Sequence, residues 1–286
     1  MAQKPSAGHH YVAQAILSNF CFVGQSTYYI KRSKLEGGVE KRNKNSIFKR
    51  RHYNSLTLNS GKKDDSLEKF FAYQFDNYIP DFVEIFRAAL KSSSVDFPSD
   101  ELRFRFIQFF FNHMKRTPDF IEPIVQEVTE ATFHAGFLAE YEKEHGPLTD
   151  KDKALYEDKE RLSDIVSNSR VQNISRQSLP VLETLFRMDI CVATPARSTK
   201  QFIVGSNPVV RFENFPRQPL GQIGVELWTT LAPDIAVGFG NLAEKKNAVQ
   251  LDDTSVRKIN SELTRRSSAI AGRSEKLVLS LARANW

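Results

Sequence analysis

The chain has 286 residues, with 40 Lys and Arg against 34 Asp and Glu, and a formal net charge of +6. Its hydrophobic fraction of 41% and charged fraction of 26% are those of a soluble globular protein, and they exclude a disordered chain, a collagen and a bundle of membrane helices. The two cysteines, Cys21 and Cys191, are too few for a disulfide framework or a four-cysteine zinc site.

The sequence lacks the run of about 18 apolar residues that a membrane helix needs. Residues 1–6 lack the apolar segment of a secretion signal. We therefore expect a cytoplasmic protein with no membrane partner. The sequence leaves the cofactor unknown and predicts no metal ligands, although a metal site could still be built from distant residues.

Charge is unevenly distributed along the chain. Residues 1–65 carry 12 basic and 4 acidic residues, residues 66–190 carry 15 and 22, and residues 191–286 carry 13 and 8. The basic ends predict either a face for a polyanion such as nucleic acid, or segments that pack against the acidic middle and compensate its charge. The acidic middle could in turn bind a basic protein partner.

The N-terminal third predicts small elements. Residues 9–20 have apolar side chains four apart, which is typical of a short helix, and residues 26–31 are rich in β-forming residues and predict a strand. A turn is expected at residues 36–39, followed by a basic, polar stretch over residues 40–63.

The middle third predicts helices. The pattern Asp65-Ser66-Leu67-Glu68 is a helix start, and the helix that follows should be kinked or divided at Pro80. Ser99 begins a second helix that runs to Arg116, where Thr117-Pro118 ends it. Further helices are expected over residues 118–144, 149–174 and 176–187.

The last third changes pattern. Strands are expected over residues 189–193, 201–204, 209–212, 225–229 and 235–239, with a final helix over 254–271. Helices and strands that are segregated along the chain favour an α+β fold. We expect one compact domain over residues 1–286: a basic N-terminal helix and hairpin (1–65), a helical middle (66–187), and a mainly antiparallel sheet with a final helix (188–286).

The helix over 100–116 has a polar stripe on a surface otherwise rich in Phe. The stripe comprises Glu101, Arg105, Gln108, Asn112 and Arg116. If it lines a cleft, its two arginines suit an anionic ligand. If it does not, the stripe is the solvated face of the helix.

A second candidate is the basic stretch that contains Lys49, Arg50 and Arg51, with Phe48 and Tyr53 beside it. That composition suits phosphate contacts and base stacking, and it is equally typical of a solvated loop. The adjacent pair His9-His10 has no Cys, Asp or Glu cluster nearby, so a capping or core role is favoured over a metal site.

Polar residues also occur at two later positions. Ser206 and Asn207 lie in a turn before Pro208, where such side chains often bond the backbone. Asn260 is in phase with Val256 and Leu263, so it should face inward and be paired, with a structural role favoured over a ligand contact. Walker, dinucleotide-binding, zincin and nucleophile-elbow motifs are absent from the sequence.

Several of these motifs, in order, resemble a bacterial family called domain of unknown function 4238. They are His10-Tyr11-Val12-Ala13-Gln14, Leu67-Glu68, Arg116-Thr117-Pro118, Phe202-Ile203-Val204-Gly205-Ser206-Asn207-Pro208, Leu231-Ala232-Pro233 and Ile259-Asn260. Two departures stand out, because the family's Pro after His-x-Val is Ala13 here and the Asp of its S-D-x-P element is Asn207. An amide at this position cannot perform acid–base or metal chemistry as a carboxylate would.

The resemblance implies no activity, but it marks scattered polar positions that would suit one shared site. The leading hypothesis is an effector enzyme acting on a phosphate-bearing substrate such as RNA or DNA, in the manner of a nuclease. The catalytic candidates are His10 as acid or base, Arg116 and Asn207. The candidates for substrate binding are Arg105, Gln14, Ser206, Asn260, Lys49, Arg50 and Arg51. The alternatives are a non-catalytic module that binds a protein partner, or a sensor of a small anionic ligand.

Overall fold

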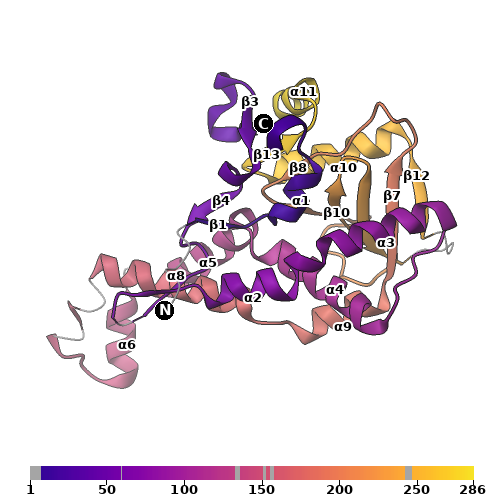
Figure 1. Ribbon diagram of the computed structural model, residues 1–286. Helices are drawn as coiled ribbons and strands as arrows, with labels where there is room; N and C mark the ends of the chain where they lie inside the picture. Colours follow the sequence, from indigo (N-terminus) through magenta and orange to yellow (C-terminus); the bar gives the residue numbers. More distant parts are fainter. Residues whose placement is uncertain (1–7, 59, 133–135, 151–152, 155–157, 242–246) are drawn as a thin grey trace, which may run out of the picture.

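A computed structural model describes residues 8–58, 60–132, 136–150, 153–154, 158–241 and 247–286 (Figure 1). The fold is α+β, as the sequence predicts. Its largest sheet has the strand order β12-β7-β11-β10-β9, formed by Ala248–Leu251, Asp189–Pro195, Ile235–Gly240, Glu226–Ala232 and Val209–Phe212. All neighbours in it are antiparallel except β12, which pairs with β7 in parallel.

This sheet is covered on both faces, because its side chains alternate between two apolar clusters. In β7, Ile190 and Val192 belong to one cluster, whereas Cys191 and Ala193 belong to the other. The first cluster contains Phe106 of the helix α4 (Asp100–Lys115), and the second contains residues of α10 (Asp253–Arg266). The helical middle and the last third of the chain therefore pack on opposite faces of one sheet.

A second sheet joins the two ends of the chain. Its strand order is β3-β2-β13-β8, formed by Glu40–Asn43, Ser26–Lys31, Ala269–Gly272 and Val204–Gly205. The sequence predicted the strand over 26–31 correctly, but not its pairing with the C-terminal third. The register places Ile270 opposite Ile30.

The prediction of one helix over 254–271 is wrong at its end. Helix α10 stops at Arg266, and residues 269–272 form β13, which is entirely buried between β2 and β8. A final helix, α11 (Glu275–Asn285), follows, with Ser274 accepting the Leu277 N–H at 3.2 Å. Pairing with two strands overrides a local sequence that is compatible with a helix.

The predicted helix over 9–20 is also wrong in part. Residues Gly8–His10 form the strand β1, and α1 covers only Gln14–Asn19. The strand β1 pairs with β4 (Lys49–Arg51), so the basic stretch contains a strand that was not predicted. The pairing is anchored by His9, which is fully buried and whose Nδ1 accepts the Asn54 N–H at 2.9 Å.

The helical middle follows the predicted start and stop signals. The chain divides into α2 (Ser66–Gln74) and α3 (Ile79–Ser92), with Pro80 in the first turn of α3. Ser99 caps α4 by accepting the Leu102 N–H at 3.2 Å. The remaining helices are α5 (Pro118–Thr132), α6 (Phe137–His145), α8 (Lys159–Ser175) and α9 (Leu179–Arg187). The predicted helices over 118–144 and 149–174 both include residues outside those described.

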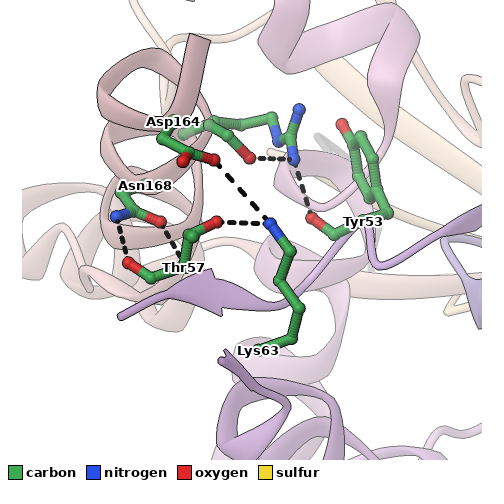
Figure 2. A network of polar contacts seen from close by, with 7 residues as sticks. Tyr53, Thr57, Lys63, Asp164 and Asn168 are labelled. Carbon is green, nitrogen blue, oxygen red and sulfur yellow. Dashed lines mark hydrogen bonds and ion pairs between the residues drawn. The ribbon is translucent and has the colours of Figure 1, made fainter. Parts of the chain in front are cut away.

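Helix α8 is tied to the N-terminal segment through the hairpin formed by β5 (Leu56–Thr57) and β6 (Lys63–Asp64). Figure 2 shows the network: the Asn168 amide donates to the Thr57 carbonyl at 2.8 Å and accepts the Thr57 N–H at 2.7 Å. Lys63 bonds the Thr57 hydroxyl at 2.5 Å and lies 3.7 Å from Asp164. These contacts fix one face of α8, which leaves its other face to line a cavity beside α5.

Short 3-10 helices cover Val23–Gln25, Arg32–Gly37, Lys44–Ser46 and Asp76–Tyr78. Within the described part of the chain, no helix is long and apolar enough to cross a membrane.

Candidate functional site

His10 lies at the end of β1, where its imidazole is partly buried. The side-chain amide nitrogen of Gln14, the first residue of α1, is 3.3 Å from each of its ring nitrogens. Burial, and after it the charges of Lys49 and Arg116, lower the pKa of His10 from 6.5 to about 4, against the opposing effect of hydrogen bonds to the backbone of Lys44 and Asn45. The imidazole is therefore neutral at pH 7 and can accept a proton.

One cationic side chain, that of Lys49, lies beside this imidazole on the solvent side. Lys49 pairs directly with His10 across the β1–β4 ladder, so the two residues share one face. Lys49 and Arg51 are exposed, whereas Arg50 forms an ion pair with Glu122 and lies 5.6 Å from the centre of the Tyr53 ring. Of the three basic residues predicted from this stretch, Lys49 is the one that stands opposite His10.

Arg116 caps the C-terminus of α4 and is buried, with 2% of its surface exposed. Its Nη1 donates to both carboxylate oxygens of Asp76, at 3.0 and 3.2 Å, and its guanidinium lies 5.6 Å from the Phe71 ring centre. Its Nε and Nη2 are buried without a partner among the described residues. This position makes Arg116 a support for the site, because its charge acts on His10 from within the core.

A network that the sequence did not predict joins α5 to the second sheet. The Asp119 carboxylate in the first turn of α5 bonds the Ser206 hydroxyl and accepts the Ser268 N–H at 2.7 Å. Ser206 also accepts the Ala269 N–H at 2.9 Å. Asp119 thus connects the Arg116-Thr117-Pro118 motif to the turn that contains Ser206. The sequence indicates this role of Asp119 only through its position directly after Pro118.

The two asparagines have separate surroundings. The Asn207 N–H donates to the Ser267 hydroxyl at 3.1 Å, and its side-chain Oδ1 is buried without a partner among the described residues, beside an apolar cavity. Asn260 faces inward, as predicted, where it accepts the Ile203 N–H at 3.1 Å and donates to the Gln201 carbonyl at 2.9 Å. These bonds fix the segment before β8 and satisfy the side chain within the fold.

The polar stripe of α4 runs from the surface into the core. Arg105 is at the outer end, where it bonds Glu101 at 2.8 Å and Gln74 at 3.1 Å and lies over the Tyr78 ring. At the inner end, Asn112 is 1% exposed and Arg116 is paired in the core. The stripe is therefore neither a cleft wall nor a fully solvated face.

The structure brings His10, Gln14 and Lys49 together, with Arg116 behind them. Ser206 belongs to the adjoining Asp119 network, whereas Arg105 and Asn260 lie elsewhere. The described residues contain no group of three or more His, Cys, Asp or Glu placed to hold a metal ion. We refer to His10, Gln14, Lys44 and Lys49 as the His10 surface.

The fold and this surface define an α+β protein with a neutral histidine beside a basic strand. The chain belongs to the family described as protein of unknown function (DUF4238), whose model matches residues 8–277. This match confirms the resemblance seen in the sequence motifs. No curated protein and no solved structure matches the chain with significance.

Proposed function

We propose that this protein is an enzyme that cleaves a phosphate-bearing polymer such as RNA or DNA at the His10 surface. The observation that supports this proposal is the neutral imidazole of His10. The two charged side chains that affect its pKa most, Lys49 and Arg116, are both cations. A base in cationic surroundings is matched to an anionic substrate, because the substrate's charge offsets that of its neighbours.

Binding of a phosphodiester would tune the histidine for catalysis. The two cations lower the pKa of His10, so an anion placed between Lys49 and the imidazole would raise that pKa towards neutrality, where a general base works best. His10 would take the proton of the attacking hydroxyl, either water or the 2′-hydroxyl of RNA. As the new P–O bond forms, the bond to the leaving oxygen breaks, and that oxygen takes a proton from the imidazolium or from water.

The other residues of this surface fit supporting roles. Gln14 lies at hydrogen-bond distance from the ring and would hold its orientation. Lys44 is anchored through a 2.6 Å bond to the Ser18 hydroxyl and, with exposed Lys49, would contact phosphate. Arg116 is a positioning residue in this proposal, since its guanidinium is buried against Asp76.

A cleavage assay tests the proposal. The purified protein is incubated with total RNA, single-stranded DNA and duplex DNA, in Mg²⁺, Mn²⁺ or a chelator. We expect His10→Gln to lower the rate by about 10²–10⁴-fold, the usual contribution of general acid–base catalysis. Lys49→Gln should weaken binding and reduce its salt dependence by about one phosphate contact.

Lys91→Gln is the matched control, because Lys91 is an exposed lysine at the end of α3, and it should behave as wild type. Cleavage that survives in His10→Gln at the wild-type rate would contradict the proposed role of His10. Absence of both cleavage and salt-sensitive binding would exclude nucleic acid as the substrate, and a protein partner would then be sought.

A further inference from the structure

A cavity of about 950 Å³ lies beside α5, α8 and α9, and no residue of the His10 surface lines it. Its walls are mainly apolar and include Phe111, Ile121, Ile124, Ile165 and Val181. This volume is at the upper end of the range of roughly 300–1,000 Å³ that is usual for small-molecule sites. Ile124 and Ile165 remain 46% and 41% exposed, so apolar surface extends to solvent at the cavity mouth.

The charged residues that line this cavity, among those described, are all cations. They are Lys115, Arg176, Arg211 and Arg266. Arg211 and Arg266 are paired with Glu213 and Glu262, whereas Arg176 is exposed and has no ion pair among the described residues. An apolar cavity with positive charge at its edge is complementary to a ligand with an apolar body and a negative head group.

Among the described residues, Lys115 has partners for two of its three hydrogen-bond donors. Its ammonium donates to the Ile174 carbonyl at 3.4 Å and to the Arg176 carbonyl, and it lies 4.8 Å from the Phe111 ring centre. An ammonium group has three N–H donors, so one remains for a ligand. Burial lowers the pKa of Lys115 to about 8, and a bound anion would compensate this cost.

Three of the residues that line the cavity also carry a buried polar atom that has no partner among the described residues. These atoms are Oδ1 of Asn207, Oε1 of Gln177 and Nε of Arg211. Such atoms are costly to leave unpaired, and a polar ligand group or a bound water satisfies them.

We propose that the cavity binds an amphipathic anion, namely a single aliphatic chain with an anionic head group held by Lys115. The chain would lie along the apolar wall formed by Ile121, Ile124 and Val181. A fatty-acid carboxylate and an alkyl phosphate share this chemistry. The site is separate from the His10 surface and does not depend on the activity proposed there.

Calorimetric titration with octanoate, decanoate and dodecanoate tests the apolar contribution. Each added methylene group should tighten binding by about fourfold, the equivalent of burying one CH₂. Dodecyl phosphate in a parallel titration distinguishes the two head groups, and neutral dodecanol should bind at least about tenfold more weakly than either anion. Affinity for dodecanoate should also fall as the pH rises above about 8 and Lys115 loses its proton.

Two variants test the residues. Lys115→Gln should weaken dodecanoate binding by about tenfold or more, and Ile124→Glu, at a half-exposed position that tolerates charge, should do the same by repulsion and lost apolar contact. Arg187→Gln, an exposed arginine of α9 outside the cavity, is the matched control and should bind as wild type.

Three results would overturn the proposal. They are no binding of any anion below about 1 mM, affinity that is independent of chain length, and wild-type affinity in both Lys115→Gln and Ile124→Glu. Equal binding of dodecanol and dodecanoate would likewise contradict a head-group site at Lys115. If Lys115→Gln unfolds, Ile124→Glu alone decides the outcome.

Discussion

Replacing Arg116 with glutamine should destabilise the fold, because its guanidinium is buried and paired. Breaking a buried ion pair costs about 3–5 kcal/mol. The Asp76 side chain that would be left behind is 25% exposed, so water solvates it in part and we expect the lower end, about 3 kcal/mol. At about 2–4 °C per kcal/mol for a chain of this size, Tm should fall by about 6–12 °C.

The assay is thermal unfolding of Arg116→Gln, Asp76→Asn and the double variant. Because the two side chains are 3.0 Å apart, their effects should not add, and a coupling free energy of at least about 1 kcal/mol is expected. Arg105→Gln is the control, since its pair with Glu101 is on the surface, where water screens it, and its loss should leave Tm close to that of wild type. A wild-type Tm for Arg116→Gln together with lost cleavage would refute this reasoning and make Arg116 a substrate contact.

Three further predictions concern stability. Asn260→Ala leaves the Ile203 N–H and the Gln201 carbonyl unpaired, and it should lower the free energy of unfolding by about 2–4 kcal/mol. Denaturant unfolding measures this effect, and an unchanged midpoint would contradict the structural role of Asn260. Gly205→Ala places a Cβ 2.3 Å from the Ser267 hydroxyl and should cost about 1–3 kcal/mol. Gly37→Ala, where a Cβ meets no atom within 4 Å, is the comparison for steric crowding. Because the pKa of His10 is lower in the folded state than in the unfolded chain, the free energy of unfolding should fall by about 2 kcal/mol as the pH drops from 6.5 towards 4, after allowing for the partial exposure of the ring. A His10→Gln variant whose stability has the same pH dependence as wild type would contradict this prediction.

Local signals predicted the helical middle well. Ser99 has the side chain of a helix cap and accepts the Leu102 N–H, and Pro80 divides α2 from α3 because proline fits only the first turn. Helical phase also placed Asn260 inward. These features depend on neighbours within a few residues, so the sequence contains the information that determines them.

Features that depend on distant segments were missed. The stretch around Ile270 is a strand because β2 and β8 pair with it, although its own residues are compatible with a helix. The strand β1 forms because β4, some 40 residues later, is placed beside it. Neither pairing has a local signal of the kind that a hairpin turn provides.

The sequence identified single residues of the candidate site but not their contacts, because those contacts also join distant segments of the chain. The motif order identified His10, Gln14 and Arg116, but only the fold shows that Arg116 is paired with Asp76 and lies behind the histidine. Lys115, next to Arg116 in sequence, donates instead to the carbonyls of Ile174 and Arg176 and lines the cavity. The division into one compact domain and the identity of the partner remain predictions.

The most direct test of the proposed function is the pKa of His10 with and without a substrate analogue. The chain has six histidines, and comparison with His10→Gln assigns the His10 signals in an NMR titration. We predict a pKa of about 4 in the free protein, and a rise of at least about one unit when a non-cleavable 2′-O-methyl oligonucleotide binds between the imidazole and Lys49. A pKa that the oligonucleotide leaves unchanged would contradict the proposal that His10 and Lys49 hold a phosphodiester.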